Sequence, residues 1–234
     1  MSTVESLTTP AVLVDRARLR ANVRRMQERA EEQDVRLRPH VKTHKSPAIG
    51  RLQREEGAAG ITVATVSEAE AFAEAGFEDV RIASPLVQAA KHRRIRTLRA
   101  KISVSFTVDG EENLRRASEA HEETPAAVLL EIDTGQHRCG VRWDRREEIV
   151  RLGRLTEELP GVRLDGILTH AGQVYGGPGE NESRAESLER HAREERDRML
   201  EVARVLAEDG LAEPGSLEIS VGSTPTASRF ENRS

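Results

Sequence analysis

The feature that most constrains the fold is a regular alternation of short apolar stretches with segments that carry helix signals. A segment with helical spacing or a helix-start signal separates each apolar stretch from the next. Because no two of these stretches adjoin as a hairpin, the pattern predicts a parallel sheet crossed over by helices. Seven stretches are predicted to be strands: 35–42, 60–65, 80–84, 102–108, 126–133, 164–170 and 217–221.

Seven strands are one too few for a closed (β/α)8 barrel, which needs eight to complete its hydrogen-bond ladder. Residues 11–14 could supply the missing strand, or it could lie beyond Ser234. An open, doubly wound sheet is the alternative, but no Gly-x-Gly-x-x-Gly turn follows an early strand. The sequence therefore predicts a TIM-barrel-like α/β fold, a (β/α)8 barrel of which seven strands are identified and the place of the eighth stays open.

Composition limits the classes of partner. Charged residues make up 32% of the chain, yet the net charge is −4 and aromatic residues are only 3%. This combination gives neither a basic patch nor stacking platforms for nucleic acid. No stretch approaches the roughly 20 apolar residues that cross a bilayer, and the single Cys139 suits a reducing compartment. We expect a cytoplasmic protein that acts on a small molecule and binds neither nucleic acid nor membrane.

The segment 38–47, Arg-Pro-His-Val-Lys-Thr-His-Lys-Ser-Pro, suggests a chemical role. It holds Lys42 and Lys45, two of only four lysines in a chain that uses arginine almost everywhere for positive charge. A lysine amine can lose its proton and attack a carbonyl, whereas a guanidinium stays protonated. A basic loop at a strand end explains the segment equally well when it is taken alone.

Polar side chains follow four of the predicted strands, at the ends that form the functional face of a parallel barrel. Each has an ordinary explanation: His170 as a core histidine, Tyr175 and Cys139 as packed residues, and Gly222-Ser223-Thr224 as a plain turn. The spacing of His40, His44, His137 and His170 supports no closed zinc site. Together, however, a lysine, an arginine, a tyrosine and an anion-binding turn suit pyridoxal 5′-phosphate.

Four motifs, in order, resemble the D-threonine aldolase / D-serine dehydratase family of fold-type III pyridoxal-phosphate enzymes, which share the barrel of the alanine racemase N-terminal domain. The resemblance extends from about Thr9 to Phe230. The motifs are Arg38-Pro39-His40-Val41-Lys42-Thr43-His44-Lys45, Asp133-Thr134-Gly135-x-x-Arg138-x-Gly140-Val141, Thr169-His170-Ala171-Gly172-x-x-Tyr175 and Gly222-Ser223-Thr224-Pro225-Thr226.

The resemblance implies a role for each site residue. Lys42 would form the Schiff base with the cofactor and act in catalysis together with His170. Arg138 would contact the 3-oxygen side of the ring, which His170 and Tyr175 would line. The phosphate would be held by Gly222, Ser223 and Thr224.

The resemblance also implies a domain organisation. Residues 1–15 would form an N-terminal strand that pairs with a C-terminal β-domain, and residues 16–234 would form the incomplete cofactor-binding barrel. Family members continue into an eighth strand and that β-domain, where a His and a Cys bind a divalent metal, zinc or manganese. We therefore expect no metal ligands in this chain, and a homodimer for full-length members.

The expected function is a pyridoxal-phosphate-dependent lyase that cleaves the Cα–Cβ bond of β-hydroxy-D-amino acids, as D-threonine aldolase does. The alternatives are β-elimination of the D-serine dehydratase type, with racemisation as a third outcome, or a truncated barrel that binds the cofactor without catalysis. A metal-dependent hydrolase that uses the histidines is a further class.

Overall fold

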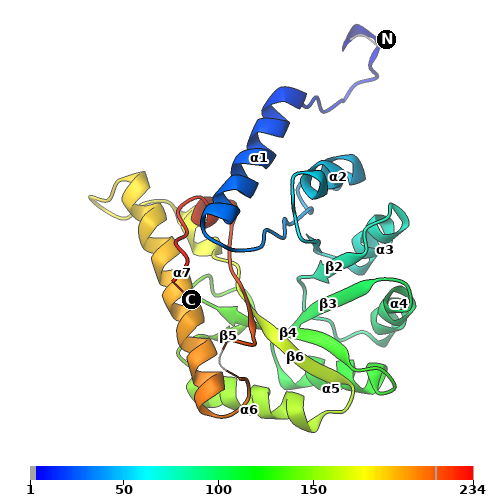
Figure 1. The fold of residues 1–234 in the computed structure, drawn as a ribbon, viewed down its shortest axis with the longest axis vertical. Coiled ribbons are helices and arrows are strands. Elements are labelled where there is room, and N and C mark those ends of the chain that lie inside the picture. The colour runs from blue at the N-terminus through cyan, green and yellow to red at the C-terminus, as the bar shows by residue number, and fades with distance from the viewer. Residues whose placement is uncertain (1–3, 214, 234) are drawn as a thin grey trace.

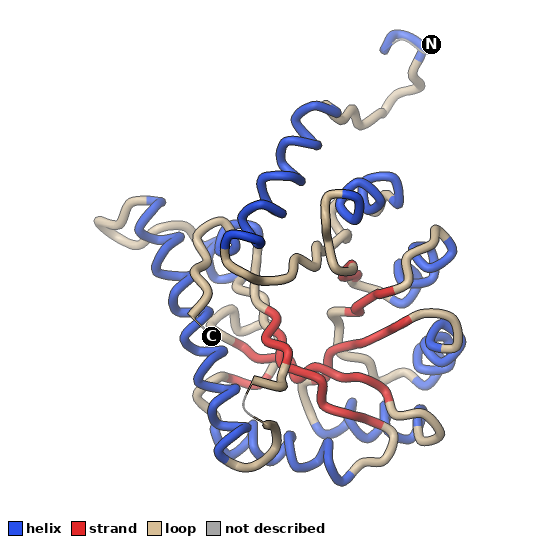
Figure 2. Tube along the Cα trace, in the orientation of Figure 1, coloured by secondary structure: helices blue, strands red, loops and turns tan. Residues whose placement is uncertain are grey.

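The computed structural model describes residues 4–213 and 215–233, which form a parallel sheet curled into a half-barrel. The strands lie at the centre of the molecule (Figure 2). Two-residue β5 (Val141–Arg142) pairs only with the end of β4. The remaining strands, all parallel and hydrogen-bonded in this order, are β1 (Ile61–Val63), β2 (Asp79–Ile82), β3 (Ser103–Val108), β4 (Ala126–Asp133), β6 (Val162–Leu168) and β7 (Glu218–Ser220).

Helices α2 to α6 form an arc outside the curled sheet, and long α7 runs along the side of its last strands (Figure 1). The principal helices are α1 (Arg16–Glu32), α2 (Pro47–Glu55), α3 (Val66–Glu74), α4 (Ala89–Arg99), α5 (Glu111–His121), α6 (Arg146–Glu158) and α7 (Arg184–Glu208). Short helices are η1 (Val4–Ser6), η2 (Gly172–Gly176) and α8 (Thr224–Ala227). Several begin where the sequence predicts a cap: Asp15 accepts hydrogen bonds from the N–H groups of Ala17 and Arg18.

The core lies between the sheet and the arc of helices. Strand β4 is buried almost throughout, because one face meets the barrel interior and the other meets helices. Val128, Leu129 and Leu130 are all at most 1% exposed. A strand covered on both faces has a continuous apolar sequence instead of an alternating one, which is why the apolar stretches identified these strands correctly.

Six of the seven predicted strands are confirmed, whereas the prediction of a strand over 35–42 is wrong. This segment is extended but forms only an isolated bridge, His40 with Thr62. A parallel ladder at the preceding pair would need an N–H from residue 39, and Pro39 has none. The segment then turns over residues 41–44, where the N–H of Lys45 reaches the carbonyl of Val41 at 2.8 Å.

The barrel is consequently open between the 35–38 segment and β7. A groove of about 540 Å³ lies there and is lined by both elements. Ion pairs instead of backbone hydrogen bonds connect the two sides of the opening: Arg81 of β2, the second strand of the sheet, binds Glu218 of β7 at 2.6 and 3.0 Å. Arg36 lies 3.9 Å from the same carboxylate. The predicted seven-stranded barrel is thus corrected to a half-barrel with charged contacts across its opening.

The N-terminal segment points away from the barrel (Figure 1). Val12 is 94% exposed, and residues 7–15 form no strand with the described part of this chain. The pairing of residues 1–15 with another domain stays a prediction, and residues 1–3 lie outside the described residues. Across residues 4–213 and 215–233, no helix is both long and apolar enough to cross a membrane.

Candidate functional site

Lys42 lies at the carboxyl end of the extended segment that pairs with β1, in the turn over residues 41–44. Partial burial lowers the pKa of its amine, and the nearby Arg138 guanidinium lowers it further, while Glu68 and Glu131 oppose the shift. Lys42 forms no ion pair with a carboxylate among the described residues. A lysine in this electrostatic environment is neutral more often than an ordinary one, so it is a better nucleophile.

Both lysines are exposed, but Lys45, unlike Lys42, is ion-paired. Its amine forms an ion pair with Glu68 at 3.0 Å, and its side chain is 65% exposed. Glu68 also accepts a hydrogen bond from the N–H of Ala64 at 2.7 Å, which holds the carboxylate at the end of β1. The structure therefore separates the two lysines into one that faces the site and one that is paired at the surface.

His40 is a site residue that the sequence reasoning missed, because it considered this histidine only as a possible metal ligand. Burial lowers the pKa of His40 to about 4, and the neighbouring Lys42 adds to the shift. Its Nδ1 accepts a hydrogen bond from the Lys42 N–H at 3.3 Å. The imidazole is thus neutral at ordinary pH and fixes the backbone from which the Lys42 side chain extends.

His170 follows the carboxyl end of β6 and lies near Lys42 and Arg138. Its Nδ1 lies 3.3 Å from the carbonyl oxygen of Gly222. Because a carbonyl only accepts, Nδ1 carries the proton, and neutral His170 presents the lone pair of Nε2. Burial lowers the pKa of His170, and both Lys42 and Arg138 lower it further, although the Gly222 carbonyl opposes this. These mutual effects show that the lysine, the arginine and the imidazole lie close together.

Arg138 is carried by a loop between β4 and β5 that Asp133 organises. The Asp133 carboxylate accepts hydrogen bonds from the N–H groups of Gly135 and His137, at 2.8 and 3.0 Å. Burial alone would raise the pKa of Asp133, but these N–H groups bring it below its ordinary value. Gly140 has a φ of 95°, and a Cβ there would lie 2.8 Å from the backbone nitrogen of Asp133. Only glycine fits this position without displacing β4.

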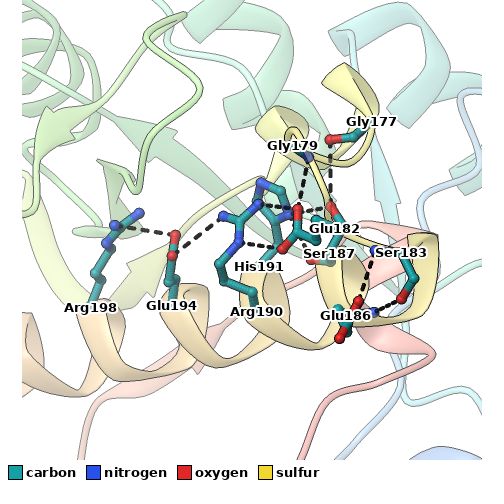
Figure 3. Close-up of polar contacts among 10 residues, drawn as sticks. All are labelled: Gly177, Gly179, Glu182, Ser183, Glu186, Ser187, Arg190, His191, Glu194 and Arg198. Atoms are coloured by element: carbon teal, nitrogen blue, oxygen red, sulfur yellow. Dashed lines mark hydrogen bonds and ion pairs between the residues drawn. The ribbon is translucent and has the colours of Figure 1, made fainter.

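Tyr175 lies in η2, next to His170, with a distance of 6.2 Å between the two ring centroids. Its side chain is 64% exposed, so it covers one side of the imidazole and does not belong to the core. The glycine-rich loop that follows is tied to the start of α7 (Figure 3). Glu182 accepts hydrogen bonds from the Gly179 N–H at 2.9 Å and from the Arg190 guanidinium at 2.8 and 3.0 Å.

The Gly222-Ser223-Thr224 turn follows β7, but its N–H groups are not all available to a ligand. The Gly222 N–H is donated to Glu195 at 2.7 Å, and the Ser223 N–H to the hydroxyl of Thr226 at 3.1 Å. Thr224 is exposed, and its N–H and hydroxyl have no partner among the described residues. The turn can therefore hold an anion through Thr224. The hydroxyl of Ser223 beside it is buried and hydrogen-bonded to Thr226 at 3.1 Å, so it would have to turn its proton toward the anion.

Two buried carboxyl groups complete the surroundings of the site, and the sequence reasoning missed both. Glu131 of β4 accepts a hydrogen bond from the thiol of Cys139 at 2.8 Å, while its other oxygen has no partner. Glu195 of α7 is 0% exposed. Its position on the helix was a usable signal, because Ala192, Met199 and Val202 recur on the same buried face.

A lysine with a lowered pKa, an arginine and a neutral imidazole at the strand ends of a parallel α/β half-barrel define a class of protein that can bind an aldehyde cofactor. The family model for the alanine racemase N-terminal domain matches residues 14–233, and the chain belongs to that family. Enzymes of the family depend on pyridoxal 5′-phosphate.

The similar proteins include enzymes named for β-hydroxy-D-amino acids and also alanine racemases. The chain is 39% identical over 230 residues to D-threo-3-hydroxyaspartate dehydratase from Delftia sp. (strain HT23), covering 96% of this chain and 57% of that enzyme. It is 39% identical over 168 residues to D-threonine aldolase from Arthrobacter sp., covering 71% of this chain and 44% of that enzyme. The chain spans about half the length of these curated relatives.

Solved structures of a dehydratase and of an aldolase are also similar to this chain. The Delftia dehydratase superposes with a TM-score of 0.89 at 37% identity, over 98% of this chain and 59% of that one. D-threonine aldolase from Filomicrobium marinum gives 0.81 at 27% identity, over 99% of this chain and 67% of that one. A mutant of the Delftia dehydratase has been solved in a metal-free form. Within the described part of this chain, no group of three His, Cys, Asp or Glu side chains lies together as a metal site.

Proposed function

We propose that this chain is the cofactor-binding part of a pyridoxal-phosphate-dependent lyase for β-hydroxy-D-amino acids. The observation that carries the proposal is the position of Lys42, unpaired and beside Arg138 and His170, while Lys45 is paired with Glu68. The similarity to a dehydratase and to an aldolase with substrates of this class supports it.

Pyridoxal phosphate, when bound, supplies an aldehyde and a conjugated ring that takes up electrons released at the substrate Cα. Lys42 would hold the aldehyde, since the lowered pKa of its amine leaves the nitrogen lone pair free more often. Arg138 would provide positive charge beside the ring oxygen, and Thr224 and Ser223 would bind the phosphate group.

His170 would hold or accept a proton at Nε2. Its Nδ1 proton is committed to the Gly222 carbonyl, and its lowered pKa keeps the ring neutral at ordinary pH. A neutral imidazole with a free lone pair is suited to take a proton from a substrate hydroxyl or from Cα. Tyr175 limits the orientation of the ring by covering one side of it.

The bond that breaks distinguishes two candidate reactions. Cleavage of Cα–Cβ would convert the substrate to glycine and an aldehyde, which is the reaction we expected from the sequence. Elimination of the β-hydroxyl would give a keto acid and ammonia. The similarity to the Delftia dehydratase, which covers 96% of the chain against 71% for the Arthrobacter aldolase, is the observation that favours elimination.

The lysine assignment is tested by incubating the protein with pyridoxal phosphate, reducing with borohydride and mapping the label by mass spectrometry. We expect the label on Lys42, its loss in Lys42→Ala and its retention in the matched control Lys45→Ala. A label that stays on Lys45 in the Lys42→Ala variant would refute the assignment. D-threonine is then supplied, and glycine and ammonia are measured to separate cleavage from elimination. Labelling of Lys42 without either product would favour the non-catalytic cofactor-binding barrel.

A further inference from the structure

The carboxyl group of Glu195 contacts the backbone of the Gly222-Ser223-Thr224 turn. It comes from the middle of α7 and is 0% exposed. One oxygen, Oε1, accepts the Gly222 N–H at 2.7 Å. The other, Oε2, has no hydrogen-bond partner in the part of the chain that the structure describes. Buried carboxylates are normally fully hydrogen-bonded or ion-paired, so this half-satisfied group needs an explanation.

Among the described residues, no cation forms an ion pair with Glu195. Its neighbours along α7 are occupied elsewhere: Arg196 pairs with Asp197 at 2.7 Å, and Arg198 pairs with Glu194 at 3.3 Å. Three sets of ionisable side chains lie around the carboxyl. His170 is connected to it through Gly222, and buried His191 lies on the same helix. The groove that Glu195 also lines carries Arg29, Arg36, Arg38, Arg196, Glu218 and Arg233. None of them forms an ion pair with it.

Gly222 connects this carboxyl to the site. Its N–H is donated to Glu195 and its carbonyl accepts from His170, so a single residue links the buried acid to the imidazole near Lys42. The φ of Gly222 is 132°, in the region that only glycine adopts readily. The Glu195 carboxyl therefore fixes the backbone from which both Ser223 and Thr224 extend.

We propose that binding of the cofactor's phosphate at this turn is coupled to the uptake of one proton by Glu195, which acts as a positioning residue for the turn. The inference rests on the proposed function, because it takes residues 222–224 as the phosphate site. A phosphate dianion at Ser223 and Thr224 would lie one or two residues along the chain from Gly222, whose N–H the Glu195 carboxyl accepts. Two anions so placed cannot both stay ionised without a large cost, and the buried carboxyl is the one that takes a proton.

The pH range of the effect follows from the free protein. Burial raises the pKa of Glu195 to about 7, although the hydrogen bond from the Gly222 N–H opposes the rise. The carboxyl is therefore mostly ionised above about pH 7, and phosphate binding there must include proton uptake. An organic phosphate, whose second pKa is near 6, is a dianion throughout this range. The affinity for the phosphate group should fall about tenfold for each pH unit above 7.

Pyridoxal, which lacks the phosphate, separates this effect from the titration of Lys42. Both aldehydes react with the lysine, so the ratio of their dissociation constants reports the phosphate contribution alone. We measure the ratio by absorbance titration between about pH 7 and about pH 9. In the wild type we expect the dissociation constant of pyridoxal divided by that of pyridoxal phosphate to fall about tenfold for each unit of rising pH. In Glu195→Gln this ratio should stay constant. The matched control, Glu208→Gln at the exposed far end of the same helix, should keep the wild-type slope.

Calorimetry of the wild-type protein tests the coupling without any variant. Titrations in two buffers with different ionisation enthalpies give the protons taken up, and we expect about one more proton for pyridoxal phosphate than for pyridoxal near pH 8. Equal proton uptake for the two aldehydes, or a ratio that is flat with pH in the wild type, would overturn the coupling while the phosphate site stands. If pyridoxal binds as tightly as pyridoxal phosphate at every pH, both the phosphate site and the coupling are wrong.

Discussion

Removing the Glu218 carboxylate should destabilise the half-barrel strongly, because it leaves the Arg81 guanidinium buried without a counter-ion. The Arg81 side chain is only 4% exposed, and Glu218 binds it at 2.6 and 3.0 Å while Ser105 accepts from its Nε at 3.1 Å. Loss of one partner from a buried pair costs about 3–5 kcal/mol. Since Glu218 is itself 31% exposed, water can reach the guanidinium in the variant. We therefore expect Glu218→Gln to lower the unfolding free energy by about 3 kcal/mol, the lower end of that range.

Urea unfolding, followed by circular dichroism and by the fluorescence of the single Trp143, measures this change. The exposed pair Arg163–Asp165 provides a control, because its side chains are 65% and 34% exposed. Asp165→Asn should cost less than about 1 kcal/mol. The double variant Arg81→Leu/Glu218→Leu should be much closer to the wild type than Glu218→Gln is, since it removes both charges.

The pH dependence gives a second measurement of the same pair. Arg81 holds the pKa of Glu218 below its ordinary value of 4.5. A depressed carboxyl pKa contributes stability that is complete above the unfolded value and is lost as the pH falls through the folded value. Wild-type stability should thus decline below about pH 4.5 more steeply than that of Glu218→Gln. Two outcomes would refute the account of a buried, uncompensated charge. One is that Glu218→Gln lowers the unfolding free energy at neutral pH by less than about 1 kcal/mol. The other is that the double variant is as unstable as Glu218→Gln.

Three further predictions concern other buried groups. Burial lowers the pKa of His121 to about 4. The unfolding free energy should therefore fall by about 1.4 kcal/mol for each pH unit as the pH is lowered from 6.5 to 4, because only the unfolded state takes up a proton there. His121→Gln should make the urea midpoint less dependent on pH. Burial and the hydrogen bond to Glu131 raise the pKa of Cys139 to about 11, so alkylation near pH 8 should be roughly 100-fold slower than for an ordinary thiol, and Glu131→Gln should accelerate it. Gly140→Ala should cost roughly 3 kcal/mol and lower Tm, because its Cβ would meet the β4 backbone at positive φ.

The strands that the sequence predicts correctly are those whose signals are local. A buried parallel strand is a run of apolar residues, and β4 has such a run with a cap or turn at each end. The segment 35–42 instead alternates apolar and basic residues, a pattern that also suits a strand, yet it forms one bridge only, because Pro39 lacks the N–H that the next bridge with β1 would use. Whether the position of a proline needs a backbone N–H for pairing depends on the register with the neighbouring strand. That register cannot be read from the sequence of the segment alone.

The candidate site shows the same division between local and long-range information. The sequence indicates that Lys42, Arg138 and His170 lie near one another because each follows an extended segment or a strand, and parallel strand ends meet at one face. Glu195 stands in the charged run Arg193-Glu194-Glu195-Arg196-Asp197, where nothing in its chemistry distinguishes it from its neighbours. Only the helical period places it on the buried face, and only the fold places the Gly222 turn against it. His40 is comparable, because its neutrality comes from burial and from Lys42.

The stability of the half-barrel and the geometry of its site depend on the same contacts. Lys42 comes from the first extended segment and the anion-binding turn from β7, so the two lie at opposite ends of the hydrogen-bonded sheet. No backbone ladder connects these ends in the described residues; the charged contacts of Glu218 with Arg81 and Arg36 do. A change that releases β7 should therefore move the phosphate site away from the lysine before it unfolds the sheet. Glu218→Gln should weaken pyridoxal phosphate binding more than pyridoxal binding, and Asp165→Asn should weaken neither.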